Sequence, residues 1–330
     1  MKKYLIPPVV LFLITGCEYT ETDSLPFDPE IRFTVSSRIA DGKDITCLYV
    51  TDEDNYYYSS GNQIIHIENL TENVTEVTSE VMSMDWNKTL NSLWFGTKSS
   101  GLGKLKEGKV TYYTKEKNNL PRDMVYALVC DPNGVVWFSS SAHMLGGLGR
   151  YMDGDFAFFT PENSSLPDNL IKSLACRDNT VYVSTGGTVT QQKVVSINGR
   201  NWKPLPVEGY YLMDMDVAPD GTLYVVDDTG LSSSMMYNKL YEYKNEKCKN
   251  ILPQKSFFYP HPYHLRTDLR NNLWVAQFTE DGKGNLAVYD GDRWHVAPDD
   301  FPDLYIKCIE VDRKNNIWLG TSKGIYILNQ

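Results

Sequence analysis

The amino-acid sequence predicts an all-β fold, a seven-bladed β-propeller, from two observations. A short segment centred on an aromatic residue recurs at intervals of roughly 40–50 residues, which is the period of propeller repeats. Each copy is a run of aromatic and β-branched residues bounded by Gly, Asn and Asp, the composition of strands and tight turns. The apolar residues lack the spacing of amphipathic helices, so a helical repeat is disfavoured.

Seven aromatic residues anchor the repeats and imply seven blades. The best-matched copies, Asn-Ser-Leu-Trp, Asn-Asn-Leu-Trp and Asn-Asn-Ile-Trp, contain Trp94, Trp274 and Trp318. A fourth copy contains Trp137, and tyrosine takes the same place in the weaker copies. Because these residues recur in equivalent strands, we expect them to pack between blades rather than to form a site. In chain order the anchors are Tyr57, Trp94, Trp137, Tyr182, Tyr224, Trp274 and Trp318.

One repeat shows all four strands that a blade requires. Residues 125–130 form its inner strand, and Asp-Pro-Asn-Gly at 131–134 forms a tight turn. Residues 135–139 and 147–151 form the second and third strands, and 156–160 form the outer strand. The other repeats are parsed by analogy with this unit.

The last repeat ends at its third strand and needs an outer strand from elsewhere. Its third strand is predicted at residues 324–328, just before the sequence ends. Residues 31–39 are strand-like and precede the first complete repeat. We expect them to supply the outer strand of blade seven, since closure removes a free strand edge. The propeller domain is therefore predicted over residues 30–330.

The first sixteen residues have the features of a bacterial signal peptide that ends at a cysteine. Lys2 and Lys3 precede an apolar stretch at residues 5–14, which is shorter than the ~20 residues of a membrane span. The small residues before Cys17 resemble a lipobox, in which the cysteine is acylated. The alternative is an ordinary signal peptide with an incidental cysteine. We expect a leader at 1–16, a lipid on Cys17 and a polar tether at 17–29.

Composition narrows the classes of partner and cofactor. The formal net charge is −10, which argues against nucleic acid as a partner. Five cysteines follow Cys17, and we expect free buried thiols, with a disulfide as the alternative that export permits. No nucleotide-binding, EF-hand or serine-hydrolase motif is present, so no cofactor is expected. His261 and His264 have a spacing suited to a metal, but no further ligands accompany them, and no metal is expected.

One face of the predicted propeller carries the long connections between strands. They span residues 139–146, 184–193, 227–238, 254–263 and 277–285, and they are rich in aromatic and amide side chains. Such side chains stack on sugar rings or peptide side chains and orient them. The alternative is that these loops fold onto themselves and bind nothing. The candidate ligand-binding residues are His143, Gln191, Gln192, Met236, Tyr237, Phe258, Tyr259, His261, Tyr263 and His264.

Charged residues occupy matching positions on the inner strands of blades five to seven. Counted from the turns, Asp216, Arg266 and Glu310 share one level, and Asp214 and His264 precede it by two residues. Adjacent inner strands surround the propeller axis, so Arg266 is predicted to lie between the two acids near the channel. This group is either an ion-pair network that fixes the order of the blades or an acid/base or ion-binding centre. We favour the network.

Two segments resemble the two-component-regulator propeller repeat. Residues 312–327 fit its Asn-Asn-Leu-Trp-Ile-Gly-Thr pattern best, and residues 119–151 fit it well. In that family the repeats form the periplasmic sensor of hybrid histidine kinases in Bacteroidetes-like bacteria, often sensing glycans. This sequence departs from that family pattern because we find no kinase, membrane helix or second propeller in it, and we therefore expect a stand-alone lipoprotein.

These inferences combine into two expected functions. The first is a lipoprotein of the cell envelope, expected at the outer membrane, whose long-loop face binds a glycan, a peptide or an envelope protein. The second is a propeller enzyme of the lyase or hydrolase kind with its site at the central channel. The lipid anchor would make the membrane a partner in either case.

We predict that Cys17 is lipidated. Replacing Cys17 with serine should abolish both metabolic labelling with palmitate and membrane retention after cell fractionation, because the acyl chains are the expected anchor. The unaltered protein is the control. A Cys17→Ser variant that is still labelled and still sediments with membranes would contradict the prediction.

Overall fold

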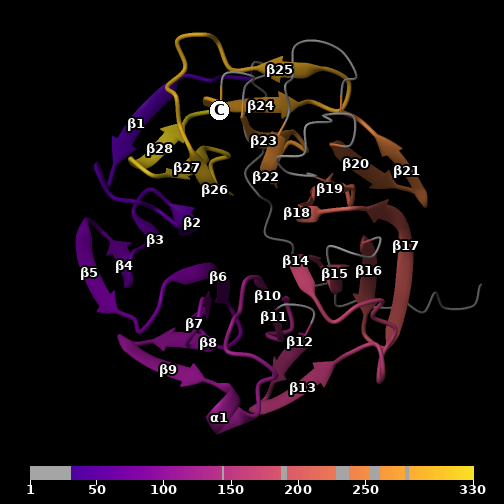
Figure 1. The fold of residues 1–330 in the computed structure, drawn as a ribbon. Coiled ribbons are helices and arrows are strands. Elements are labelled where there is room, and N and C mark those ends of the chain that lie inside the picture. Colours follow the sequence, from indigo (N-terminus) through magenta and orange to yellow (C-terminus); the bar gives the residue numbers. More distant parts are fainter. Residues whose placement is uncertain (1–30, 143–144, 187–191, 228–237, 253–260, 279–281) are drawn as a thin grey trace, which may run out of the picture. The chain divides into compact units, whose positions relative to one another are not determined.

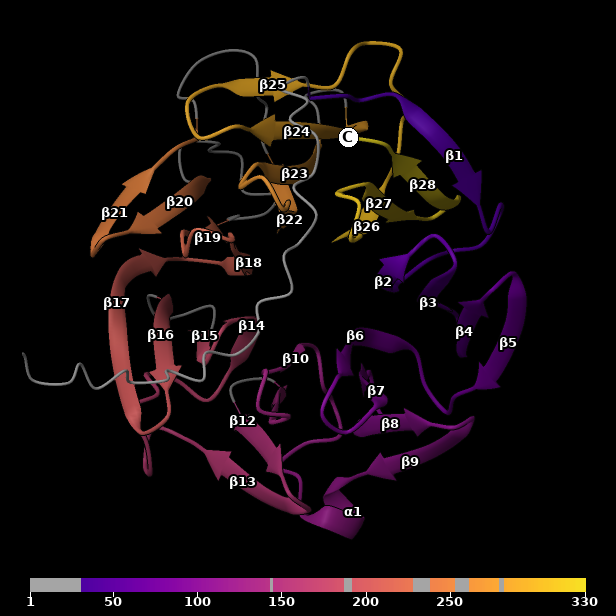
Figure 2. The ribbon, with the colours of Figure 1, turned by 180° about the vertical axis from the view of Figure 1, so that it is seen from behind.

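Strands account for nearly all regular structure in the described residues, and they form seven four-stranded antiparallel sheets around a central axis. The computed structural model describes residues 31–142, 145–186, 192–227, 238–252, 261–278 and 282–330. These residues belong to one compact unit, Ile31–Gln330. Figures 1 and 2 show the sheets as successive blades of a ring. The predicted seven-bladed propeller is confirmed.

The first four blades follow one another along the chain, each running from its inner to its outer strand. Blade one consists of β2 (Cys47–Asp52), β3 (Asn55–Ser60), β4 (Gln63–Glu68) and β5 (Thr71–Glu76). Blade two consists of β6 (Val81–Asn87), β7 (Ser92–Thr97), β8 (Leu102–Lys106) and β9 (Lys109–Tyr113). Blade three consists of β10 (Leu128–Cys130), β11 (Val136–Ala142), β12 (Leu145–Met152) and β13 (Asp155–Phe159). Blade four consists of β14 (Ile171–Arg177), β15 (Thr180–Thr185), β16 (Gln192–Asn198) and β17 (Asn201–Gly209).

The remaining three blades complete the ring. Blade five consists of β18 (Leu212–Val217), β19 (Leu223–Asp227), β20 (Lys239–Lys244) and β21 (Lys247–Asn250). Blade six consists of β22 (His261–Thr267), β23 (Leu273–Phe278), β24 (Gly284–Tyr289) and β25 (Trp294–Val296). Blade seven consists of β26 (Ile306–Val311), β27 (Ile317–Thr321), β28 (Gly324–Leu328) and β1 (Val35–Ile39). One short helix, α1 (Lys115–Asn118), links blades two and three, and no helix of the described chain is long and apolar enough to cross a bilayer.

The first strand of the described residues closes the ring, as predicted. β1 pairs antiparallel with β28, with Val35 opposite Leu328 and Ile39 opposite Ile325. The strand begins at Val35 and not at residue 31. The four residues before it are held differently: the Gln330 side chain bonds both backbone groups of Arg32, and the Phe33 ring lies 5.9 Å from that of Trp274.

The repeated Asp-x-x-Asn-Asn-x-Trp motif is a structural unit. Asp312 Oδ1 accepts the N–H of Asn316 at 2.8 Å, and its Oδ2 accepts Nε1–H of Trp318 at 3.1 Å. Asp268 holds Trp274 in the same way, at 3.0 Å. The carboxylate therefore shapes the turn and satisfies an indole N–H that is buried between blades. Trp94, Trp274 and Trp318 are fully buried, and Trp137 is nearly so, which confirms their place in the core.

Two details differ from the sequence expectation. The inner strand of blade three starts at Leu128 instead of residue 125, because the Val125 N–H donates to Thr97 O of the preceding blade at 2.9 Å. The five described cysteines are free thiols, but only Cys47 is fully buried. The other four, Cys130, Cys176, Cys248 and Cys308, are half-buried.

We predict that β1 is required for a closed, monomeric ring. Deleting residues 1–40 should lower the melting temperature markedly or cause aggregation, since Ile325 and Ile327 would lose their cover and β28 would become a free edge. A deletion of residues 1–30, which keeps β1, is the matched control. If both truncated proteins are equally stable and monomeric, the closure has no energetic importance.

Candidate functional site

The seven inner strands surround a channel of about 860 Å³. Residues from the inner strands of all seven blades line this channel. Each inner strand follows the connection from the preceding blade. We call the end of the channel at which the inner strands begin the mouth. The mouth therefore lies on the face that carries the long connections, and the short turns between inner and second strands lie at the opposite end.

A shared β-bulge shapes the mouth. Five inner strands shift register near their first residue, in blades two, four, five, six and seven. A bulge inserts one extra residue and redirects its side chain. Four of the extra residues line the channel: Met82, Lys172, Met213 and Lys307. The fifth, Tyr263, packs instead on neighbouring aromatic rings. The bulges thus give the mouth a mixed apolar and basic lining.

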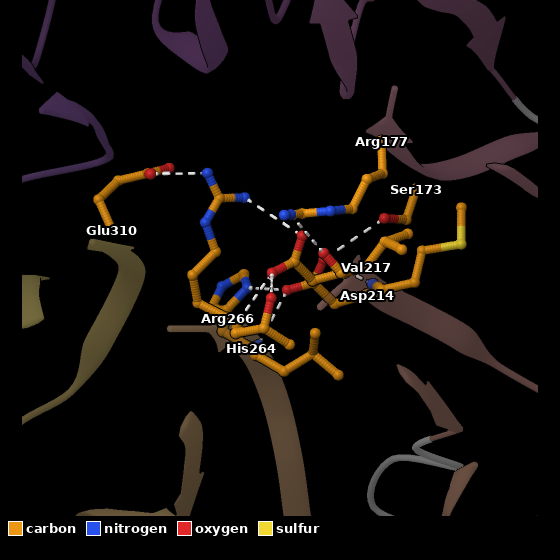
Figure 3. A network of polar contacts seen from close by, with 11 residues as sticks. Ser173, Arg177, Asp214, Val217, His264, Arg266 and Glu310 are labelled. Atoms are coloured by element: carbon orange, nitrogen blue, oxygen red, sulfur yellow. Dashed lines mark hydrogen bonds and ion pairs between the residues drawn. The ribbon is translucent and has the colours of Figure 1, made fainter. Parts of the chain in front are cut away.

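The predicted charged group forms deeper in the channel, level with the buried aromatic anchors. Arg266, Glu310 and Asp216 lie opposite Trp274, Trp318 and Tyr224 in their sheets. Arg266 Nη2 lies 2.6 Å from Glu310 Oε2, and Nη1 lies 3.8 Å from Asp216 Oδ1. Figure 3 shows the guanidinium between blades five and seven. The predicted position of Arg266 between two acids is confirmed.

Sequence reasoning missed a fourth charged residue at this level. Asp85 lies opposite Trp94 in blade two and lines the same channel. It was missed because the turn of blade two is one residue longer, so counting from the turn misaligns it. Counting back from the tryptophan would have found it. Its carboxylate accepts the backbone N–H groups of Cys130 at 2.7 Å and Trp86 at 2.8 Å.

Three channel acids link neighbouring inner strands, which do not pair in a common sheet. Asp85 accepts a backbone N–H from blade three, while Asp214 and Asp216 accept those of Leu265 and Thr267 in blade six, at 3.1 and 2.7 Å. A buried backbone N–H without a ladder partner needs an acceptor. These acids therefore have a structural role, and this favours the network interpretation of the charged level.

Burial disfavours the ionised form of two of the acids. It raises the pKa of Asp85 to about 6, although the two backbone N–H groups oppose the shift. It raises the pKa of Glu310 to about 7, with Arg266 opposing. Both carboxyls therefore hold a proton more tightly than a carboxyl in water does.

His264 lies between the charged level and the mouth. Its Nδ1 is 3.2 Å from Asp214 Oδ2, and its side chain is 41% exposed to the channel. Asp214 Oδ1 accepts the hydroxyl of Ser173 at 3.3 Å. The sequence placed His264 on the inner strand of blade six, and it lies in β22, the inner strand of that blade. Its side chain lines the channel.

Three aromatic residues form a platform beside His264: Tyr263, Phe278 and Tyr305. The rings of Tyr263 and Phe278 stack with centroids 4.6 Å apart, and those of Phe278 and Tyr305 with centroids 5.6 Å apart. The Tyr263 hydroxyl accepts the N–H of Ile306 at 3.3 Å, and its ring meets the His264 ring edge-on at 5.4 Å. Tyr305 is 49% exposed. The platform is thus fixed through Tyr263, and Lys307 Nζ lies over the Tyr305 ring, 5.9 Å from its centroid.

The other predicted loop residues divide into two groups. Gln192 is fully buried in β16, where its Oε1 accepts the Leu212 N–H at 2.6 Å, so its placement on an exposed loop was wrong. Tyr263 and His261 belong to β22 rather than to the preceding loop. Outside the described residues lie His143, Gln191, Met236, Tyr237, Phe258 and Tyr259. In the described ranges, no three metal-binding side chains lie close enough together to hold an ion.

Comparison with known proteins identifies the repeats. Residues 119–142 and 300–323 match the family model of the two component regulator propeller. The chain carries two component regulator propeller repeats. No curated protein matches the sequence.

Solved structures share the propeller fold. The structure of streptogramin B lyase aligns with 88% of this chain and 95% of its own, with a TM-score of 0.68 and 16% identity. Extracellular domains of two hybrid two component systems from B. thetaiotaomicron align with 89% and 92% of this chain, with TM-scores of 0.62 and 0.66 and identities of 17% and 14%. Those alignments span 39% and 40% of the two sensor chains. Identities this low show a common fold alone.

We predict that Arg266 stabilises the ring by neutralising its neighbours. Arg266→Met should destabilise the fold by about 1–3 kcal/mol, less than a fully buried pair would, because the side chain is 39% exposed. Replacing Arg266 and Glu310 together with apolar residues should recover part of the loss, since Glu310 is no longer left without its cation. Asp216 is kept because its carboxylate accepts the backbone N–H of Thr267. Denaturant melts measure both; a double variant no better than the single would refute the network.

We also predict that Asp85 makes stability depend on pH. Its pKa is raised in the fold, so its contribution is present below the unfolded pKa of about 4 and is lost as pH rises through about 6. In the Asp85→Asn variant, the denaturant midpoint should depend less on pH between about 4 and 6. The control is Asp300→Asn, an exposed position, which should leave the pH dependence unchanged. An unchanged slope in the Asp85 variant would contradict the shift.

Proposed function

We propose that this protein is a cell-envelope lipoprotein whose propeller recognises a glycan or a peptide at the channel mouth. The observation that supports this most directly is the union of three features at one end of the molecule. The channel opens there, the aromatic platform is exposed there, and the polar group of His264 lies just inside. Ligand sites commonly combine a concave, largely apolar wall with a few well-placed polar groups.

The dimensions and chemistry of the mouth suit recognition of a small or extended ligand. A cavity of about 860 Å³ lies within the range of roughly 300–1,000 Å³ that ligand pockets span. Its apolar lining is unusually accessible, with Tyr126 41% and Met213 45% exposed. Exposed apolar groups gathered at one place usually mark an interaction site. Aromatic rings such as Tyr305 can stack on a sugar ring or on a peptide side chain.

The proposed location in the cell envelope rests on the N-terminal sequence. A basic start, a short apolar stretch and small residues before Cys17 support export and acylation. The extracellular domains that share the fold are consistent with a propeller working outside the cytoplasm. In this proposal the outer membrane carries the anchor and the propeller meets its ligand in the surrounding aqueous space.

A second candidate function is catalysis in the channel. The Asp214–His264 pair is the feature that favours it, because a carboxylate that holds one imidazole nitrogen leaves the other available for proton transfer. Glu310 and Arg266 lie one level deeper and could stabilise charge. Recognition is preferred because Asp214 and Asp216 already accept backbone N–H groups of the neighbouring blade.

A glycan and peptide array probed with the protein lacking residues 1–22 tests the proposal. Binding should be saturable, and Tyr305→Ala should weaken it about tenfold or more, because the stacking surface is lost. Leu70→Ala is the matched control, since Leu70 is 89% exposed in the β4–β5 turn, on the face away from the mouth. Binding that Tyr305→Ala leaves unchanged would remove the mouth from the proposal, and chemical conversion of an array compound would favour the enzyme.

A further inference from the structure

The carboxylate of Asp214 is saturated with hydrogen-bond donors. Its Oδ1 accepts the N–H of Met215 at 2.9 Å and the hydroxyl of Ser173 at 3.3 Å. Its Oδ2 accepts the N–H of Leu265 at 3.1 Å and faces Nδ1 of His264 at 3.2 Å. Figure 3 shows the contacts of Ser173 and His264 with Asp214. Two backbone donors and one hydroxyl hold the acid in place, so its orientation does not depend on the histidine.

This arrangement determines which nitrogen of His264 carries the proton. An ionised carboxylate only accepts hydrogen bonds, so Nδ1 must be the donor to Asp214. In the neutral imidazole the other nitrogen, Nε2, is then an acceptor. Nε2 has no hydrogen-bond partner among the described residues, and the side chain lines the channel. The edge contact with Tyr263 holds the ring plane as well.

We propose that His264 determines the ligand specificity of the mouth by accepting a hydrogen bond at Nε2. The ligand class that fits is a ring compound with a hydroxyl or amine donor on its edge, whose face stacks on the platform. Asp214 is the positioning residue that fixes the imidazole and its tautomer. This inference rests on the proposed recognition function and adds the chemical group that the site selects.

The site selects between ligands because a ligand that satisfies Nε2 and one that does not differ in binding free energy. A ligand with a donor in reach completes the hydrogen bonding of Nε2. A ligand with only an acceptor, such as an ether oxygen at the same place, faces the lone pair of the neutral imidazole and leaves both groups unpaired. Sites built to bond a hydroxyl reject the analogue that lacks it far more strongly than apolar pockets reject a change in size. Because Asp214 and Tyr263 hold the ring, His264 cannot turn to relieve the mismatch.

The tautomer is measured first, and this measurement needs no ligand. Long-range ¹⁵N–¹H correlation spectra of the histidine-labelled protein, recorded at mildly alkaline pH, distinguish Nδ1–H from Nε2–H imidazole. The expected result for His264 is a single Nδ1–H form, and Asp214→Ala should give a mixture of both tautomers. An Nε2–H form in the unaltered protein would overturn the inference. Because this first result comes from the unaltered protein, it stands even if the Asp214 variant does not fold.

Specificity is measured second, with methyl glycosides and their mono-deoxy analogues as paired probes. The unaltered protein should prefer one hydroxylated member over its deoxy partner by about tenfold or more. His264→Phe keeps a ring of similar size but has no acceptor, and it should reduce that ratio to near unity while deoxy binding persists. A ratio that His264→Phe leaves intact overturns the inference but not the recognition proposal. If the unaltered protein binds no member of the panel, the specificity role of His264 is overturned for this ligand class, even where peptide binding upholds the proposed function.

Discussion

The structure depends on how the backbone groups at the inner edge of each blade find hydrogen-bond partners. Every inner strand pairs with its own sheet on one side and meets a strand of the next blade on the other, without a shared ladder. Its inward backbone donors therefore need acceptors from side chains. Asp85 and Asp216 supply them across two of the blade junctions. Three of the channel acids, Asp85, Asp214 and Asp216, thus complete hydrogen bonding that a continuous sheet would have provided.

That constraint explains why charge and candidate site coincide. Asp214 and Asp216, which link blades five and six, line the same channel as His264. Burial raises the pKa of Asp85 in blade two and of Glu310 in blade seven. Arg266 offsets part of this cost at the most crowded junction. The same carboxylate of Asp214 that serves a backbone donor also orients His264. The structural role and the proposed recognition role thus share atoms, and a substitution at Asp214 would affect both.

The sequence was sufficient for the fold because its key contacts are local. The turn aspartate and the tryptophan that it bonds are separated by only a few residues, so the motif around Asp312 and Trp318 is visible as a pattern. Arg266 and its acids were also predictable, since a fixed turn length relates each to its repeat. Asp85 was not predicted because the turn between the first two strands of blade two is one residue longer.

The mouth could not be predicted in the same way. Its bulge residues share a backbone position but no chemical type, as Met82 and Lys172 illustrate. The platform draws Tyr263, Phe278 and Tyr305 from two strands and a connection, and no spacing rule relates them. Gln192 was misplaced because polarity suggested a loop, whereas its amide is buried to bond the backbone of blade five.

The closure of the ring has a consequence for the order in which the chain can fold. β1 is made first and β28 last, and the bonds between Arg32 and Gln330 join residues 298 positions apart. Contacts of such separation form late, because the loop that they close is the whole domain. Six blades can assemble from local hairpins as the polypeptide emerges, but the seventh waits for β28. A ribosome that still holds β28 therefore keeps the propeller open.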